Sequence, residues 1–340
     1  MITIKNINLI YLLPVLSIIL SVLFFFFLEK LKLIINIYDN GSSDKRKIHL
    51  GKIPPIGGMI FYLIFVIFYL LNIFFDFENE FFTFKEQIII LFTASSIFIM
   101  GLLDDKYSLS PLRKSVFFIF IISILLLNNT ELQVYFIRFE TIETLITLDD
   151  FTFFFTLFCI FSFINAFNMF DGINLQSGFY LFLFFLIFLF KDINSLFFIS
   201  LIIPLILFLY NNYKNRIFLG NSGTYFLSYL LSIYLIKSNI IFDKISVEEI
   251  LILLLIPGLD MLRLFLKRTI LGNSPFLPDK NHIHHLLLEK FDKLTVSIII
   301  IMLTVIPYLI YLLFLKSLIV VFFQAILYLI LIYSNKIKII

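Results

Sequence analysis

The chain has 340 residues, of which 61% are hydrophobic and 14% charged, and its mean hydropathy is +1.05. A soluble globular domain carries about 25% charged residues, so the composition excludes a soluble protein and predicts an integral membrane protein. The formal net charge of +3 gives no reason to expect a nucleic-acid partner, and the single cysteine, Cys159, excludes a disulfide within the chain.

Eleven apolar segments are predicted to cross the membrane as helices, because about 20 apolar residues span its hydrocarbon core. These segments are 8–28, 53–75, 87–103, 115–128, 151–167, 178–190, 195–210, 224–237, 248–265, 295–315 and 317–334. Ten spans is the alternative, since the region 178–210 can be divided differently. The first segment lacks a small-residue cleavage site and is expected to be retained. The predicted fold is therefore a single all-α polytopic membrane domain over residues 1–340, with its motifs within 45–290.

The distribution of basic residues predicts the orientation of the chain. Alternate loops hold 19 of the 26 Lys and Arg, namely 29–52, 104–114, 211–223, 263–293 and the C-terminal end. Cytoplasmic loops are enriched in Lys and Arg, so we expect a periplasmic N-terminus and a cytoplasmic C-terminus in a bacterial plasma membrane. The opposite loops 76–86 and 128–150 are acidic, and alternation in 133–139 predicts a small external hairpin.

Two acidic motifs lie in the loops that we place on the cytoplasmic face. Asp104 and Asp105 end an apolar run, and adjacent carboxylates on a helix are expected to reach different partners. They can bind a divalent cation or take a proton, with a solvated helix cap as the alternative. Asn165, Asn168 and Asp171 recur every three residues, which places them on one side of a helix end. They suit a nucleotide or a metal ion, with a polar capped turn as the alternative.

Three further motifs lie on the same face. Gly220 and Gly223 surround small polar residues before a span, where backbone amides can bind an anion or simply form a tight turn. The loop ending at His282-Ile-His-His285 also contains Arg263, Lys267 and Arg268. An anionic diphosphate explains this combination better than zinc, and a lipid head-group anchor is the alternative. Lys45-Arg-Lys-Ile-His49 precedes a glycine pair, and a positive-inside anchor is its alternative explanation.

Taken in order, these motifs resemble the polyprenyl-phosphate N-acetylhexosamine-1-phosphate transferases, a superfamily of the glycosyltransferase 4 type that includes the translocase of peptidoglycan lipid synthesis. The blocks of the family are matched by Arg46, Lys47, His49, Pro55, Gly57 and Gly58; by Asp104, Asp105, Leu109, Ser110, Pro111 and Lys114; by Asn165, Asn168, Asp171 and Gly172; and by Pro275, Phe276, Asp279, His282, His284 and His285. The last block is similar to the branch that uses UDP-N-acetylhexosamines.

The resemblance implies a reaction in which a UDP-amino sugar such as UDP-GlcNAc gives its sugar 1-phosphate to undecaprenyl phosphate and releases UMP. Such a reaction would initiate a lipid-linked cell-envelope polysaccharide, such as lipopolysaccharide O-antigen. It implies Mg²⁺ as cofactor, with Mn²⁺ as an alternative, and leaves a homodimer open. The implied catalytic residues are Asp104, Asp105 and Asp171, and the metal would be bound by Asn168 and Asn221. The nucleotide would be bound by Asn165, Asn168, Asp171 and Asn174, and the diphosphate and sugar by Lys114, Arg268, His282, His284 and His285. The lipid-phosphate side would hold Arg46, Lys47 and His49.

The chain departs from the family pattern at three places. Asn221 stands where the family usually has a metal-binding Asp, Asn174 and Leu175 replace an acid and a glycine, and Gly41-Ser-Ser43 replaces Asp-x-Pro. These departures indicate either a divergent branch with a different sugar or a weakened enzyme. The muramoyl-pentapeptide branch of the same superfamily is an alternative. A catalytically impaired homologue, a transporter or a non-catalytic membrane partner is the alternative of a different class.

Overall fold

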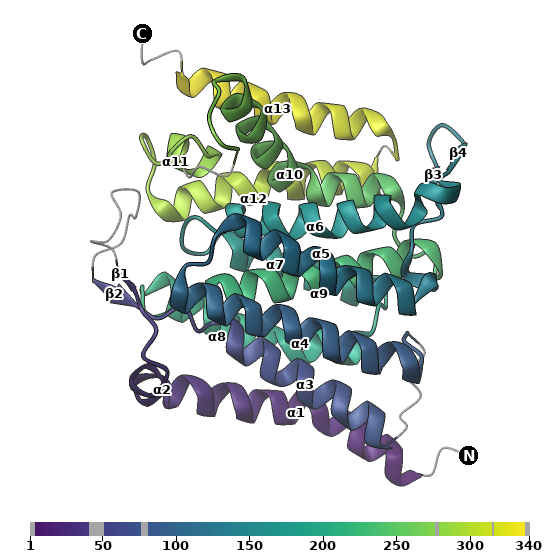
Figure 1. The fold of residues 1–340 in the computed structure, drawn as a ribbon, viewed down its shortest axis with the longest axis vertical. Helices are drawn as coiled ribbons and strands as arrows, with labels where there is room; N and C mark the ends of the chain where they lie inside the picture. Colours follow the sequence, from purple (N-terminus) through teal and green to yellow (C-terminus); the bar gives the residue numbers. More distant parts are fainter. Residues whose placement is uncertain (1–3, 41–50, 76–80, 276–278, 315, 337–340) are drawn as a thin grey trace. The chain divides into compact units, whose positions relative to one another are not determined.

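The structure is a computed structural model that describes residues 4–40, 51–75, 81–275, 279–314 and 316–336. It is mostly helical (Figure 1). The chain divides into two compact units. Unit 1 is Met1–Thr130 with Tyr180–Leu231, and unit 2 is Glu131–Phe179 with Ser232–Ile340. The boundaries at 179/180 and 231/232 fall within two helices, α7 (Gln176–Phe190) and α9 (Gly220–Ile240).

Unit 1 is built from helices that pack along one another. They are α1 (Ile4–Phe26), α2 (Leu28–Ile35), α3 (Gly58–Phe75), α4 (Phe84–Tyr107), α5 (Pro111–Asn128) and α8 (Ser195–Tyr213). Helix α1 contacts α3 and α8, and α4 contacts α3 and α5. A short antiparallel pair, β1 (Asp39–Asn40) and β2 (Lys52–Ile53), precedes α3. Neither this pair nor the short helix α2 was expected from the sequence.

Unit 2 is arranged around α10. Its helices are α6 (Thr152–Phe170), α10 (Val247–Ile270), α11 (Ile283–Leu287), α12 (Lys293–Leu313) and α13 (Leu318–Lys336), with two short 3-10 helices at Thr130–Leu132 and Asp149–Phe151. Helix α10 contacts α6, α12 and α13, and the short helix α11 contacts α12 and α13. The predicted hairpin is confirmed as β3 (Phe136–Phe139) paired antiparallel with β4 (Thr144–Thr147), which the sequence had placed a few residues too early.

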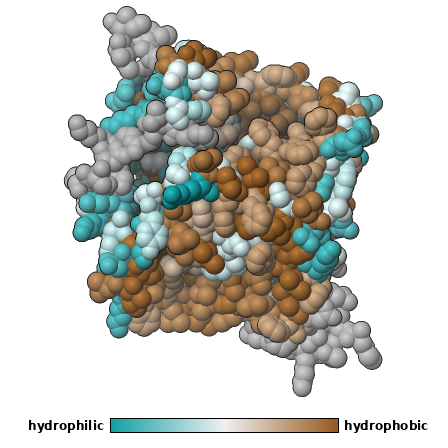
Figure 2. Space-filling model, in the orientation of Figure 1, coloured by the Kyte–Doolittle hydropathy of each residue, from teal (hydrophilic) through white to brown (hydrophobic). Residues whose placement is uncertain are grey.

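Each of the eleven apolar segments expected to be helical overlaps a helix of the structure. Five helical segments are long and apolar enough to cross a membrane among the described residues: Phe84–Tyr107, Pro111–Asn128, Asp149–Phe170, Ser195–Tyr213 and Lys293–Leu313. Large apolar side chains such as Phe120, Phe158 and Phe322 are exposed, and hydrophobic residues cover most of the surface drawn in Figure 2. The chain is an all-α, multi-pass membrane protein.

Side-chain caps explain why two of these helices begin before their apolar runs. Thr83 Oγ1 accepts a hydrogen bond from the Glu86 backbone N–H, and the Glu86 carboxylate accepts one from Thr83 N–H at the start of α4. Ser246 and Glu249 make the same reciprocal pair at the start of α10. Each pair satisfies two backbone donors that a helix start leaves free, so polar residues outside the apolar segments belong to the helices.

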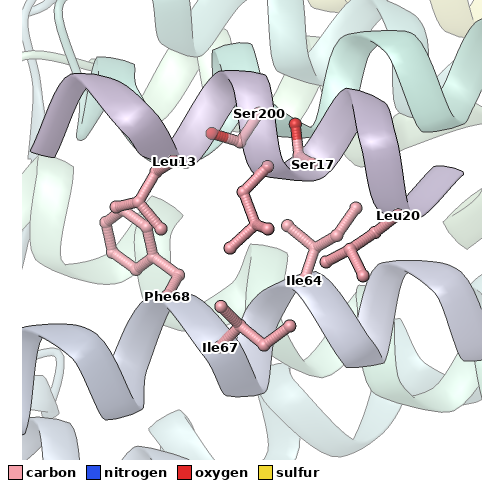
Figure 3. A pocket seen from close by; sticks show the side chains of 8 residues that line it. Leu13, Ser17, Leu20, Ile64, Ile67, Phe68 and Ser200 are labelled. Atoms are coloured by element: carbon pink, nitrogen blue, oxygen red, sulfur yellow. The ribbon is translucent and has the colours of Figure 1, made fainter. Parts of the chain in front are cut away.

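An apolar groove lies in unit 1 where α1, α3 and α8 meet (Figure 3). It is lined by Leu13, Leu16, Ser17 and Leu20 of α1, Ile64, Ile67 and Phe68 of α3, and Ser200 of α8. The Ser17 hydroxyl donates to the Pro14 carbonyl and the Ser200 hydroxyl to the Leu196 carbonyl. Because both hydroxyls already donate within their own helices, the groove offers a ligand mainly hydrocarbon contacts.

Candidate active site

Asp104 is a buried carboxylate with three donors inside unit 1. It is 3% exposed, although α4 continues past it to Tyr107. Its Oδ2 accepts from Lys114 Nζ at 3.0 Å and from the Tyr225 hydroxyl at 2.9 Å, and its Oδ1 accepts from Leu109 N–H at 2.9 Å. The ammonium group of Lys114 compensates the buried charge, since an unpaired buried carboxylate is costly. Asp104 and Lys114, which belong to one family block but were expected to have different roles, therefore form one ion pair.

Asp105 has a different set of partners. Its Oδ1 accepts from Asn221 N–H at 2.8 Å and its Oδ2 from Ser222 N–H at 3.1 Å. These amides belong to the first turn of α9, where N–H groups lack helical partners and a negative charge is favourable. Asp105 thus caps α9 from a distant part of the sequence. The prediction that the two adjacent carboxylates reach different partners is confirmed.

The glycines of two motifs pack against each other in unit 1. A Cβ atom on Gly58 would lie 2.3 Å from Gly223 Cα, a distance that no side chain tolerates. Gly58 N–H donates to the Leu219 carbonyl at 2.9 Å, so the backbones run side by side. Gly220 has φ +80°, and a Cβ there would lie 2.3 Å from the Pro55 carbonyl oxygen. The glycines are therefore required for close backbone approach at the Asp105-capped start of α9.

The Asn165–Asp171 motif ends helix α6 in unit 2. Asn165 and Asn168 lie in its last two turns and Asp171 is its C-cap. The Asn165 side chain donates to the Phe161 carbonyl at 2.8 Å, and Ser177 Oγ donates to Asp171 Oδ1. The Asp171 residue is half-buried in terms of solvent-exposed area, but protein atoms surround its carboxyl group densely. This desolvation raises its pKa to about 6, against the opposing effect of the Ser177 hydrogen bond.

The residues after Asp171 pack against the histidine motif of the same unit. A Cβ atom on Gly172 would lie 2.1 Å from His284 Nε2. The His284 ring is 2% exposed, and its Nδ1 is buried without a hydrogen-bond partner among the described residues. Burial, assisted by repulsion from His285 and His282, lowers the pKa of His284 to about 3, so the ring is neutral. His284 therefore lies behind Gly172 and is not presented to solvent.

The substitutions after Gly172 have distinct surroundings. Asn174 is buried, and its carbonyl accepts from the Ser297 hydroxyl at 2.9 Å. Leu175 has φ +71°, a left-handed conformation that suits glycine and is unfavourable for leucine. The backbone at residue 175 therefore has a conformation that glycine would adopt without strain.

The basic loop before the histidines is closed by an ion pair. Arg268 Nε donates to Asp279 Oδ2 at 2.9 Å, and Arg268 Nη1 donates to the Pro275 carbonyl at 2.6 Å. Partial burial is the largest single influence on Asp279 and disfavours its charged form. The hydrogen bonds from Arg268 and Asn281, together with the Arg268 charge, outweigh it and lower the pKa of this carboxyl. Arg268 Nη2 is buried and has no hydrogen-bond partner among the described residues, so this guanidinium retains an unused donor.

The structure places the predicted residues in two groups. Unit 1 brings together Asp104, Asp105, Lys114 and Asn221. Unit 2 holds the other predicted residues that the structure describes, namely Asn165, Asn168, Asp171, Asn174, Arg268, His282, His284 and His285. Arg46, Lys47 and His49 lie outside the described residues. Within the described ranges, no group of three or more His, Cys, Asp and Glu could hold a metal ion.

Sequence reasoning missed two hydroxyl partners of the carboxylates, Tyr225 and Ser177. Their positions in the sequence could have identified them, because each hydroxyl residue follows a family motif within a few residues and lies at the start of a helix. Both hydroxyls bind carboxylates that the motifs had already identified.

Comparisons with known proteins show the family of the chain. The sequence model described as Glycosyl transferase family 4 matches residues 87–239. The undecaprenyl-phosphate alpha-N-acetylglucosaminyl 1-phosphate transferase of Escherichia coli (strain K12) is 30% identical over 284 residues, which cover 79% of this chain and 74% of the relative. The enzyme of the same name from Thermotoga maritima is 27% identical over 251 residues, 74% of this chain and 73% of the relative.

A third relative carries a different lipid in its name. The decaprenyl-phosphate N-acetylglucosaminephosphotransferase of Mycobacterium leprae is 26% identical over 273 residues, 72% of this chain and 69% of the relative. The alignments span most of each protein and include the motif-bearing part of the chain. This chain belongs to glycosyl transferase family 4.

Proposed function

We propose that this protein transfers N-acetylglucosamine 1-phosphate from UDP-GlcNAc to undecaprenyl phosphate and releases UMP. The observation that carries the proposal is the likeness to relatives named for N-acetylglucosaminyl 1-phosphate transfer, over 72–79% of this chain. A phosphate oxygen of the lipid attacks the β-phosphorus of the donor, and the bond between that phosphorus and the bridging oxygen breaks. The products are polyprenyl-diphospho-N-acetylglucosamine and UMP. The lipid-linked sugar is the first intermediate of a cell-envelope polysaccharide.

The two aspartates of α4 are proposed to act on the lipid phosphate in different ways. Asp104 is proposed to orient it, and the Lys114 ammonium group 3.0 Å away holds this carboxylate in place. Lys114 is itself proposed to bind the diphosphate of the sugar donor. Asp105 fixes the first turn of α9, and with it Asn221, through its two backbone hydrogen bonds. Arg46, Lys47 and His49 are proposed to add positive charge on the lipid side. Phosphoryl transfer depends mainly on such positioning and charge neutralisation.

The residues of unit 2 are proposed to bind the donor. The amides of Asn165, Asn168 and Asn174, together with the Asp171 carboxylate, supply donors and acceptors for the nucleotide. Arg268 supplies a guanidinium whose Nη2 has no partner among the residues that the structure describes, and guanidinium groups bind phosphate oxygens well. His282 and His285 are proposed to contact the diphosphate and sugar, while the buried His284 acts from behind them.

Magnesium is proposed as the cofactor, and the oxygen atoms of this chain fit it. Mg²⁺ prefers carboxylate, amide and water oxygens, and Asn168 and Asn221 each carry an amide oxygen at a half-buried position. Asn221 lies beside the Asp105 carboxylate, which accepts from its backbone N–H at 2.8 Å. When bound, the ion would neutralise charge on the diphosphate of the donor.

The topology is proposed from the basic residues. Eleven spans, a periplasmic N-terminus and a cytoplasmic C-terminus put the motif loops on the cytoplasmic face, where nucleotide sugars are available. The loops assigned to that face hold 19 of the 26 Lys and Arg. We propose that both units belong to one transferase domain, because each of two helices contributes residues to both.

Turnover by the purified protein tests the proposal. The full chain in detergent is given undecaprenyl phosphate, MgCl₂ and one of several UDP-sugars, and UMP is measured with and without the lipid. Lipid-dependent UMP from UDP-GlcNAc, lost in Asp104→Asn and Asp171→Asn, is expected. Turnover of UDP-muramoyl-pentapeptide instead would favour the sister branch, and no UMP from any donor in a folded preparation would favour an impaired homologue.

A further inference from the structure

A buried cluster outside the residues assigned above surrounds Asp260 of α10. Its side chain accepts four hydrogen bonds in unit 2 and the residue is 4% exposed. His282 Nδ1 lies 2.7 Å from Asp260 Oδ2, while Tyr328 OH, Arg263 Nη2 and Ile283 N–H donate to Oδ1 at 2.8, 2.7 and 3.1 Å. The carboxylate therefore joins α10, α13 and the start of α11 at the first histidine of the motif.

The orientation of this carboxylate is fixed by the groups around it. Arg263 also donates to the Tyr328 hydroxyl at 2.9 Å through Nε and to the Asn281 carbonyl at 2.6 Å through Nη2. Asp260 cannot rotate without breaking several of these bonds. A buried ion pair contributes little net stability, because desolvation of two charges offsets their attraction. Stability alone therefore does not explain why Arg263, Tyr328 and Ile283 N–H all donate to the carboxylate that contacts His282.

The carboxylate determines which ring nitrogen of His282 carries a proton. A carboxylate oxygen 2.7 Å from Nδ1 accepts a hydrogen bond, so the proton resides on Nδ1 and Nε2 is the nitrogen left for a ligand. One face of the His282 ring is packed as well. The His282 and His284 rings stack with centroids 5.4 Å apart and planes within 4°, and His284 is itself packed behind Gly172.

We propose that Asp260 is a positioning residue, which holds His282 through Nδ1 and presents its Nε2 to the diphosphate of the sugar donor. The proposal rests on the proposed function. A ring that takes up a second proton donates from Nε2 to a phosphate oxygen, and Asp260 balances the imidazolium charge that this creates. A carboxylate in this position makes the histidine a directional donor, whereas the same ring without it would choose between two tautomers.

A double-mutant cycle tests whether Asp260 acts through His282. Asp260→Asn keeps the size of the side chain, but its amide can donate to Nδ1 and favour the other tautomer. We expect Asp260→Asn to lower kcat/KM for UDP-GlcNAc by about tenfold or more, and to have no further effect in the His282→Gln protein. Equal losses in both backgrounds would mean that the two residues act independently, which overturns the proposal.

Glu249→Gln provides the matched control on the same helix. Glu249 is also a buried carboxylate that accepts from a tyrosine, Tyr308 OH at 3.0 Å, and from a backbone amide, Ser246 N–H at 2.9 Å. It contacts no histidine through these bonds. A loss of thermal stability in both variants, with kcat/KM lowered in Asp260→Asn alone, is expected. If Glu249→Gln lowered kcat/KM equally, removal of any buried carboxylate would explain the effect of Asp260→Asn, and the proposal would be overturned.

Nitrogen NMR of labelled histidine rings gives a readout independent of turnover. The chain has four histidines, so the signal missing in His282→Gln identifies that residue in the wild-type protein. A protonated Nδ1 at neutral pH is expected in the wild type, and a protonated Nε2 with bare Nδ1 would overturn the proposal even if Asp260→Asn does not fold. Wild-type protein that shows the expected tautomer but releases no UMP would contradict the proposed function instead, and with it the role of Asp260 in that reaction.

Discussion

Gly172→Ala tests whether the contact between two motifs of unit 2 limits the residue at this position. The added methyl group would lie 2.1 Å from Nε2, 2.2 Å from Cε1 and 2.9 Å from Cδ2 of His284. The ring cannot simply move away, because it is buried and its centroid lies 4.5 Å from that of His285. Overpacking of this kind costs about 1–3 kcal/mol. We expect a lower melting temperature and a higher KM for the nucleotide sugar.

The double variant Gly172→Ala/His284→Ala separates this contact from general damage. His284→Ala alone removes a buried side chain, and large-to-small changes in a core cost about 2–5 kcal/mol. In the double variant, the methyl group on residue 172 enters space that the ring has left. The two losses should therefore be less than additive by about 0.5–3 kcal/mol.

Gly258→Ala is the control, because a Cβ atom on this glycine of α10 would have no neighbour within 4 Å. Alanine is favoured over glycine inside a helix by about 1 kcal/mol, so this variant should melt at or above the wild-type temperature. Thermal unfolding of the purified proteins in one detergent gives all four values. A Gly172→Ala protein that melts like wild type, or a strictly additive double variant, would refute the packing argument.

Three further predictions concern residues 175, 284 and 221. Leu175→Gly should melt at a higher temperature than Leu175→Ala, although both variants lose the buried leucine side chain. At φ +71°, a left-handed conformation costs alanine about 1–2 kcal/mol and costs glycine nothing comparable. A higher melting temperature for the alanine variant would contradict this. The pKa of His284 is lowered from 6.5 to about 3 by folding, so at this residue the unfolded chain binds more protons between these values and acidification destabilises the fold. The raised pKa of Asp171, about 6, acts in the opposite direction, so the test compares two proteins. From pH 7 to pH 5 the wild type should lose about 2 kcal/mol of stability relative to His284→Asn, and an unchanged difference between the two melting curves would contradict this. Asn221→Asp adds a carboxylate at the proposed metal position and should lower the magnesium concentration for half-maximal activity; an unchanged magnesium titration would exclude residue 221 as a ligand.

The helices could be predicted from the sequence because apolar segment length alone determines them in a membrane protein. The boundaries could not, since polar caps extend them. Thr83 and Glu86 start α4 before its apolar run, and the same helix carries Asp104 and Asp105 inside its last turn. The short helix α2 has only eight residues, too few to give a hydropathy signal of its own.

The candidate residues could also be predicted, but their partners could not. Adjacent carboxylates predicted two sets of contacts, yet nothing local indicates that Asp105 caps α9, more than a hundred residues later. The glycine pairs suggested ligand contact or turns, whereas Gly58 and Gly223 allow two backbones to touch. Asp260 lacked a recognisable spacing to His282, because folding of the intervening loop brings the two side chains within 2.7 Å.

The central claim is transfer of a sugar 1-phosphate, and the fate of the β-phosphate of the donor tests it most directly. The purified protein is given undecaprenyl phosphate, MgCl₂ and UDP-GlcNAc that carries a radiolabel on this phosphate. We predict that the label enters the lipid fraction in equal amount to the UMP released, and that Asp104→Asn abolishes both. Label that stays in UDP while the sugar moves to the lipid, or lipid without label and without UMP, would contradict the account.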